Sequence, residues 1–174
     1  LVRPYIKDLD RERIHTYEVR GTNDTWARDH GGITVTNNDK PAVFNFIFNG
    51  WGMKYPANYD NQIVFEMEKD GAFTPDIKVR YFSLVLEGGS IESDGCGTVL
   101  TTARCLFSKN RNERLSKDTI MGIIKGIFDA DRILILENGY LEGDDTDGHV
   151  DTLARFCDPE TIAYVQCTDP DDSH

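Results

Sequence analysis

The same order of secondary-structure elements recurs along the chain, and this recurrence restricts the possible folds more than any other feature. Two runs of β-branched and aromatic residues around a polar turn are followed by a helical pattern and by another strand-like run. The first unit comprises residues 31–37, 41–50, 58–71 and 76–89, the second comprises a hairpin over 88–102, a helix over 112–131 and a strand over 132–139, and residues 148–167 begin a third hairpin. Self-similar units of about 60 residues predict a repeat architecture rather than one continuously wound sheet.

The helix of the second unit has the clearest pattern. Its apolar residues fall three, four, seven and eight positions after the first, on one helical face: Ile120, Ile123, Ile124, Ile127 and Phe128. This spacing predicts an amphipathic helix with one buried stripe. The sequence as a whole predicts an α/β protein of repeated ββαβ units, in which the third unit is incomplete.

The charge of the chain restricts its partners. Its 174 residues, enough for one domain with a core, include 19 Lys and Arg against 30 Asp and Glu, which gives a net charge of −11. This balance argues against nucleic acid or an anionic membrane surface as a partner, and it suits a small cationic substrate. The longest apolar runs, such as ILIL at 133–136, are too short to span a bilayer, and the first residues lack the apolar core of a secretion signal. We therefore expect a cytoplasmic protein with no membrane partner.

The cysteines give no sign of a redox or zinc motif. Cys96, Cys105, Cys157 and Cys167 stand at wide intervals without a CxxC pair. Free cysteine usually behaves as a small hydrophobic residue in a reducing compartment. We expect buried or idle thiols.

Each hairpin carries polar, potentially reactive groups where its first strand is predicted to begin: WARDHGG, LEGGSIESD and GDDTDGHVD. Equivalent ends of repeated units meet at one axis, so Asp29, Glu87, His149 and Asp151 are expected to line one cavity. Because His149 and Asp151 are two residues apart in a predicted strand, both side chains should point to the same face.

Metal binding is one interpretation of these residues. His149, Asp151 and Glu87 could form a site of one histidine and two carboxylates, but the other histidines lack ligand spacing. A calcium loop with Gly148 as its obligatory glycine would place Ala154 at the last ligand position, where a carboxylate is required. We therefore predict no metal site.

Binding of a guanidinium group is a third interpretation. This planar cation presents paired N–H donors that two carboxylates, here Asp29 and Asp151, can bind from different sides. Replacement of its nitrogen by water usually needs a thiolate nucleophile and a histidine that transfers protons, for which His149 is the candidate. Glu87 is the candidate carboxylate that would hold the imidazole and favour its protonated form.

Four stretches together carry a family resemblance: NDTWARDHGG (23–32), FNGWGMKYP (48–56), LEGGSIESDGCGTVLTT (86–102) and GDDTDGHVDTLARF (143–156). In this order and at these intervals, they resemble the agmatine deiminase and bacterial peptidylarginine deiminase family of guanidino-group-modifying enzymes. The resemblance covers most of the chain. It implies a fivefold α/β propeller, the pentein fold, and hydrolysis of a guanidino group to a ureido group with release of ammonia, without a metal or an organic cofactor.

The resemblance also implies roles for individual residues. Asp29 and Asp151 would hold the guanidinium, His149 would be the general acid and base, and Glu87 would support it. Trp26, just before the Arg-Asp pair, would form a wall of the substrate channel.

The nucleophilic cysteine of the family comes late, in a glycine-rich segment near the C-terminus, and no segment of this chain resembles it. We expect residues 1–174 to be the N-terminal part of a single deiminase domain that is inactive alone. The acidic balance favours conversion of agmatine to N-carbamoylputrescine, in putrescine biosynthesis. The alternatives are a peptidylarginine deiminase that produces citrulline and a non-catalytic fragment that binds a cation. Open strand edges could lead to a homo-oligomer.

Overall fold

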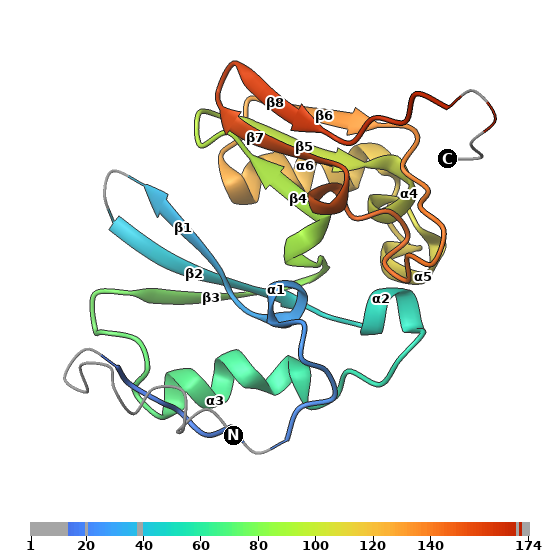
Figure 1. The fold of residues 1–174 in the computed structure, drawn as a ribbon. Helices are drawn as coiled ribbons and strands as arrows, with labels where there is room; N and C mark the ends of the chain where they lie inside the picture. Colours follow the sequence, from blue (N-terminus) through green and yellow to red (C-terminus); the bar gives the residue numbers. More distant parts are fainter. Residues whose placement is uncertain (1–13, 20, 38–39, 170, 172–174) are drawn as a thin grey trace.

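The computed structural model describes residues 14–19, 21–37, 40–169 and 171, and its strands form three separate sheets (Figure 1). The first unit contains β1 (Ile33–Asn37), β2 (Lys40–Ile47), η1 (Asp60–Gln62), α3 (Ile63–Lys69) and β3 (Lys78–Val85). The second contains β4 (Ile91–Ser93), β5 (Thr98–Thr102), α6 (Lys117–Phe128) and β6 (Arg132–Leu136). The third sheet contains β7 (Ala154–Asp158) and β8 (Thr161–Tyr164).

The first two sheets have the same topology. In each, the first two strands are antiparallel and the third strand, which follows a helix, is parallel to the second. Parallel neighbours need such a crossover connection, whereas antiparallel neighbours can be joined by a tight turn. The β7–β8 hairpin is antiparallel, as are the first two strands of the other units. The predicted order of β, β, α and β in repeated units is thus confirmed.

One hydrophobic core joins the first and second units. It contains Phe44 and Phe46 of β2, Leu84 of β3, and Ile120 and Ile124 of α6. The other three residues of the predicted stripe, Ile123, Ile127 and Phe128, are partly buried against the same core. The apolar face predicted for α6 is thus confirmed. Its burial stabilises the contact between the two units.

The helix predicted over 112–131 is shorter in the structure and is α6 (Lys117–Phe128). The short α5 (Lys109–Asn112) precedes α6, which begins after Ser116, whose hydroxyl accepts a hydrogen bond from the backbone N–H of Thr119. A serine that accepts from the third residue of a helix is a strong start signal. The helix ends at Asp129, which adopts a left-handed conformation with φ 53°.

The prediction that a strand begins at residue 148 is wrong for the first six residues, 148–153. His149 is followed by the 3₁₀ turn η3 (Val150–Thr152), and β7 begins only at Ala154. The chain enters this turn from Gly148, which has φ +85°, a conformation that favours glycine and is incompatible with a strand. His149 and Asp151 therefore lie on a tight turn and not on a pleated strand.

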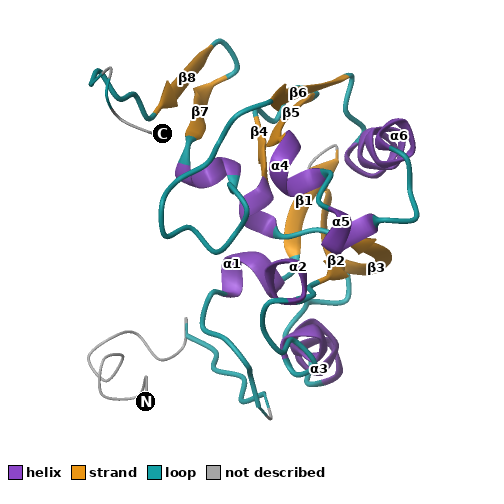
Figure 2. Cartoon of the chain, turned by 90° about the vertical axis from the view of Figure 1, so that its right-hand side faces the viewer, coloured by secondary structure: helices purple, strands orange, loops and turns teal. Residues whose placement is uncertain are grey.

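Four short elements complete the fold: α1 (Ala27–His30), α2 (Gly50–Met53), η2 (Gly88–Ser90) and α4 (Ala103–Leu106). Figure 2 shows α1, α2 and α5 near one another where the first and second units meet. Within the part of the chain that the structure describes, no helix has the length and apolar character needed to cross a membrane.

Candidate active site

A buried carboxylate fixes the segment that leads to Asp29. Asp60 is fully buried, and its Oδ1 accepts hydrogen bonds from the Thr22 hydroxyl at 2.8 Å and from the backbone N–H groups of Asn23 at 2.7 Å and Asp24 at 3.2 Å. These bonds hold the chain just before α1. Asp29 lies in α1, directly after this fixed segment, and its side chain is buried in the interior.

The carboxylate of Asp29 is held by two hydrogen bonds. Its Oδ1 accepts from the backbone N–H of Gly89 at 3.0 Å, and its Oδ2 accepts from the indole Nε1 of Trp51 at 3.1 Å. Oδ1 also lies 3.5 Å from Nδ1 of His149. Asp29 thus connects the first, second and third units.

Trp51 occupies a strained backbone segment. All four residues of α2, from Gly50 to Met53, have positive φ angles of 68°, 55°, 82° and 66°. Such conformations are costly for residues other than glycine and persist only where surrounding contacts impose them. Asn49 supplies one such contact, since its side-chain oxygen accepts from the backbone N–H of Gly52 at 3.0 Å. The turn places the buried indole of Trp51 against Asp29.

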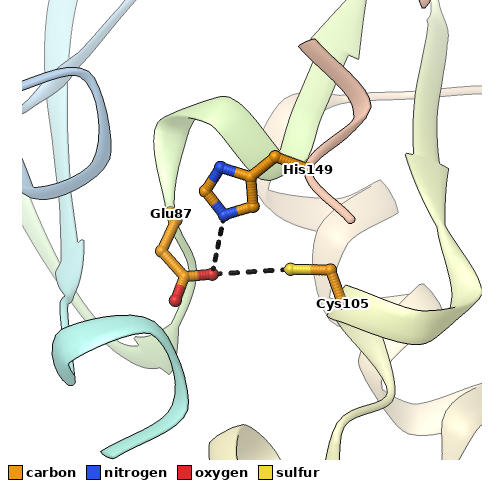
Figure 3. Close-up of side chains that lie close together, drawn as sticks. All are labelled: Glu87, Cys105 and His149. Carbon is orange, nitrogen blue, oxygen red and sulfur yellow. Dashed lines mark hydrogen bonds and ion pairs between the residues drawn. The ribbon is translucent and has the colours of Figure 1, made fainter. Parts of the chain in front are cut away.

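Glu87 forms the second part of the site and is completely buried. Its Oε2 lies 3.5 Å from Nε2 of His149 and 3.6 Å from Sγ of Cys105 (Figure 3). Nε of Arg111 donates to Oε1 at 3.0 Å and to Oε2 at 2.9 Å. Burial alone would raise the pKa of Glu87, but the nearby His149 and the Arg111 guanidinium hold that pKa below its ordinary value. Glu87 is therefore ionised at neutral pH.

Three polar groups converge on Gly89. A Cβ atom at this position would lie 2.6 Å from Nδ1 of His149, 2.7 Å from Oδ2 of Asp151 and 2.8 Å from Oδ1 of Asp29. No side chain fits there unless one of these groups shifts. Glycine at this position thus leaves the space into which an imidazole and two carboxylates point.

Asp151 is the least satisfied member of this group. The described residues provide its half-buried side chain with no hydrogen bond and no ion pair. Its pKa is raised, mainly by burial and also by the charge of Asp29, and His149, Arg28 and Arg155 offset only part of this rise. The negative charge of Asp29 and Asp151 is therefore not fully balanced by cations of the protein, and this is the electrostatic deficit of the site. A cation placed between the two carboxylates would balance it.

The acidic loop before His149 uses its carboxylates within the protein. Asp144 accepts from the backbone N–H groups of Thr146 at 2.9 Å and Gly148 at 2.7 Å, and Asp145 accepts from the hydroxyl of Tyr55 at 2.9 Å. Asp147 forms ion pairs of 2.7 Å with both Lys54 and Arg111. The carboxylates are therefore not arranged around a common point, as a calcium loop requires.

Glu87, Cys105 and His149 could hold a metal ion by position, since one ligand atom of each lies within 4.8 Å of the others. Their surroundings argue against this use. The Arg111 guanidinium already binds both oxygens of Glu87, and burial together with the charge of Glu87 raises the pKa of Cys105 well above its ordinary value. A protonated thiol is a poor metal ligand and a poor nucleophile.

Four of the five predicted site residues lie together: Asp29, Glu87, His149 and Asp151. The fifth is Trp26, whose backbone carbonyl accepts from the N–H of Asp29 at 3.0 Å. Its side chain, however, is 68% exposed and forms no hydrogen bond or ion pair with the other four within the described chain. The aromatic residue in contact with the cluster is Trp51. Sequence reasoning missed it, although its position between two glycines, in GWG, indicated an unusual backbone.

Arg111 and Cys105 were also missed as parts of the site. Both lie outside the polar starts of the hairpins, and neither has a local sequence signal that points to Glu87. The other three cysteines are exposed, and all four thiols are free.

Comparisons with known proteins agree with this arrangement. Residues 3–174 match the family model of Porphyromonas-type peptidyl-arginine deiminase. The agmatine deiminase of Pseudomonas syringae pv. tomato is 36% identical over 174 residues, and the match covers 94% of this chain and 45% of that protein. The chain thus spans about half the length of the curated relatives it matches.

Solved structures have the same fold. A C. jejuni agmatine deiminase with a cysteine-to-serine substitution and substrate bound has a TM-score of 0.89 and 39% identity, over 99% of this chain and 50% of its own. The agmatine deiminase of Enterococcus faecalis has a TM-score of 0.79 and 32% identity, over 90% of this chain and 43% of its own. These matches confirm the α/β propeller of repeated ββαβ units. With the family match over nearly the whole chain, they establish that it belongs to the Porphyromonas-type peptidyl-arginine deiminase family.

Proposed function

We propose that these 174 residues are the N-terminal part of a deiminase that hydrolyses agmatine to N-carbamoylputrescine and ammonia. The observation that carries the proposal is the convergence of Asp29, His149 and Asp151 on the space over Gly89, with Glu87 behind the imidazole. Two carboxylates that approach one point from different units suit a planar cation with several N–H donors. The names of the relatives with which the chain aligns support the same reaction.

The substrate guanidinium would lie between Asp29 and Asp151. Each carboxylate would accept N–H groups from it, and the positive charge would offset the burial and the repulsion by Asp29 that raise the pKa of Asp151. Because Trp51 and Gly89 already bind the Asp29 oxygens, that carboxylate is held in place before the ligand arrives. Preorganised groups of this kind lower the cost of orienting a substrate.

His149 would transfer the protons of the reaction. Nδ1 faces the carboxylates over Gly89, and Nε2, which has no hydrogen-bond partner within the described chain, lies 3.5 Å from the ionised Glu87. Catalytic contacts often shorten only when substrate is bound. A shorter Nε2–Glu87 contact would favour the imidazolium and leave Nδ1 as the donor that faces the substrate.

The chemistry would proceed through a covalent intermediate. A cysteine thiolate from outside these residues would attack the guanidinium carbon, and His149 would protonate the departing ammonia as the carbon–nitrogen bond breaks. Water would then attack the same carbon, His149 would accept its proton, and the thiolate would leave with its electron pair. One water is consumed, one ammonia is released, and no oxidant or reductant is needed.

Peptidyl-arginine is the second candidate substrate, because the family model that matches residues 3–174 carries that name. The net charge of −11 and the agmatine deiminase relatives favour agmatine, a small dication. The cytoplasmic location and the self-association expected from the sequence stay predictions.

The experiment is an assay of the full-length protein with agmatine and with an arginine-containing peptide, monitored by ammonia and by formation of the ureido product. We expect ammonia and N-carbamoylputrescine from agmatine, and loss of product in the His149→Ala and Asp29→Asn variants, while the exposed Asp70→Asn control retains activity. Activity on the peptide alone would make the protein a peptidylarginine deiminase. Binding of agmatine without product would indicate a non-catalytic cation-binding protein.

A further inference from the structure

The short helix α5 connects three of the four sequence stretches that carry the site, and it belongs to none of them. The Asn112 side chain donates to the carbonyl of Val85 at 2.9 Å and accepts from the N–H of the same residue at 3.0 Å. This pair of bonds attaches α5 to the end of β3, two residues before Glu87. Two residues earlier in the same helix, the carbonyl of Asn110 accepts from the side chain of Asn49 at 2.8 Å, which attaches α5 to the segment that carries Trp51.

Between these two attachments, Arg111 extends into the interior, and its side chain is only 2% exposed. Nε donates to both oxygens of Glu87, at 3.0 and 2.9 Å. Nη1 donates to Oδ2 of Asp147 at 2.7 Å, and Nη2 donates to the carbonyl of Thr146 at 2.9 Å. A single guanidinium therefore joins a residue of the second unit to the loop that precedes the third.

That loop carries His149. The hydroxyl of Thr146, whose carbonyl binds Arg111, accepts from the backbone N–H of His149 at 3.0 Å. The imidazole and the carboxylate that faces it are thus both linked to Arg111, one through Thr146 and the other directly.

We propose that Arg111 is a positioning residue for the deiminase reaction, because it fixes Glu87 and the His149 loop relative to each other without touching the substrate space over Gly89. The proposal rests on the proposed function of the site. Lysine would keep the charge but has a single nitrogen, which cannot bind Glu87, Asp147 and Thr146 in the fixed planar arrangement of a guanidinium. Arginine is required here for its shape as well as for its charge.

The charge of Arg111 has a separate, measurable consequence. The titratable and charged groups that face Glu87 are Arg111, His149 and Cys105. Of these, the Arg111 guanidinium is permanently charged, and together with His149 it lowers the pKa of Glu87. Without it, burial would raise the pKa of Glu87, so that the carboxylate would be protonated at a higher pH and would no longer support the imidazolium.

The test compares Arg111→Lys and Arg111→Gln with the wild type in the full-length protein, using kcat and KM for agmatine across pH and the NMR titration of the His149 imidazole. For both variants we expect kcat to fall by about 100-fold with KM changed by less than about threefold, since displacement of a catalytic pair by about 1 Å costs this much. Arg111→Gln should also move the acidic limb of the rate profile to higher pH, whereas Arg111→Lys, which retains the charge, should not. The exposed Arg114→Gln serves as the matched control and should leave all these quantities unchanged.

Either of two results would overturn the inference: an unchanged kcat and His149 titration in Arg111→Gln, or a loss of activity that thermal unfolding accounts for entirely. If the wild type acts on neither agmatine nor an arginine peptide, the proposed function fails, and the His149 titration alone then decides the role of Arg111. A His149 titration that differs between wild type and Arg111→Gln supports the positioning role, and an identical one contradicts it.

Discussion

The two sides of the polar cluster differ in how their charges are balanced. On the side of Arg111, every carboxylate has a cationic partner, because Glu87 pairs with Arg111 and Asp147 pairs with both Arg111 and Lys54. On the side of Gly89, the structure gives Asp151 no partner within the described chain. His149 lies between the two sides and faces Glu87 with one nitrogen and Asp29 with the other.

This difference separates the supporting part of the site from the part that would receive a ligand. Carboxylates with cationic partners are held in place and ionised, and the pKa values of the buried Glu87 and the partly buried Asp147 are lowered accordingly. A carboxylate without a partner carries a cost in the free protein, which the raised pKa of Asp151 expresses. A cationic ligand would remove that cost, so under the proposed function this unbalanced charge would favour binding of a guanidinium.

The largest effect is expected from breaking the Arg111 side. Arg111→Met leaves Glu87 and Asp147 without their shared partner, and loss of one member of a buried pair typically costs about 3–5 kcal/mol of unfolding free energy. Because the pKa of Glu87 is lowered in the folded protein, this stability is present above the unfolded value of about 4.3 and is lost as pH falls through the folded pKa. Chemical denaturation at several pH values should show a gap between wild type and variant that narrows in acid. A constant gap would mean that packing, not charge, is responsible.

A smaller effect, confined to the Gly89 side, is expected from Gly89→Ala. The backbone of Gly89 lies outside the left-handed region, so the added methyl group is not strained by φ, but it would meet His149, Asp29 and Asp151 at less than 3 Å. Overpacking of this kind costs about 1–3 kcal/mol, which corresponds to agmatine binding weakened by about 5- to 150-fold. Isothermal titration of the full-length protein measures this.

Gly122→Ala is the matched control, because a Cβ atom at Gly122 in α6 would meet nothing within 4 Å. It should leave agmatine binding unchanged. Equal binding by Gly89→Ala and wild type would show that the ligand does not occupy the space over Gly89.

The sequence predicted the Gly89 side better than the Arg111 side, and the reason is physical. Asp29, His149 and Asp151 lie at the starts of repeated hairpins, so the periodicity of the fold brings them to one axis. Arg111 lies in a short helix between the elements, and only its long side chain reaches Glu87. Neither hydrophobic periodicity nor charge patterning encodes the target of such a side chain.

Local backbone geometry explains the other differences between sequence and structure. The residues around His149 have strand-like composition, but the bonds of Asp144 to Thr146 and Gly148 set a turn whose exit is 3₁₀. His149 and Asp151 do lie close together, as predicted, but they reach the space over Gly89 from a turn and not from one face of a strand. Trp51 reaches the site through four consecutive positive φ angles, a conformation that no propensity predicts.

On the Gly89 side, Asp151→Asn is expected to increase the stability of the folded protein. The raised pKa means that the folded protein binds the Asp151 proton more tightly than the unfolded chain does. The contribution of Asp151 is therefore fully present below the unfolded value of about 3.9 and is lost as pH rises through the folded pKa. The variant should match the wild type near pH 3 and be more stable at pH 7, by less than about 1 kcal/mol because solvent screens a half-exposed carboxylate.

Asp29→Asn is the contrasting variant. It should destabilise the protein at pH 7, because one oxygen that accepts from Gly89 or Trp51 becomes an amide nitrogen. Urea denaturation of Asp151→Asn, Asp29→Asn and the wild type at about pH 3 and pH 7 measures both effects on the unfolding free energy. A less stable Asp151→Asn variant at pH 7 would mean that Asp151 has a stabilising partner and that the Gly89 side carries no electrostatic deficit.

The smallest effect at neutral pH is expected at Cys105, which lies on the Arg111 side. Burial and the charge of Glu87 raise the pKa of this thiol, so the folded protein retains its proton and loses stability as pH rises above the ordinary thiol value of about 8.5. Cys105→Ser preserves a donor toward Glu87 and removes this titration, so it should differ from the wild type by less than about 1 kcal/mol at pH 7 and become relatively more stable near pH 10. In the folded protein, a thiol-specific reagent should modify the exposed Cys96, Cys157 and Cys167 and leave Cys105 unmodified. Rapid modification of Cys105 at pH 7 would contradict this account, since it would require an accessible thiolate where the Arg111 side holds a buried, protonated thiol.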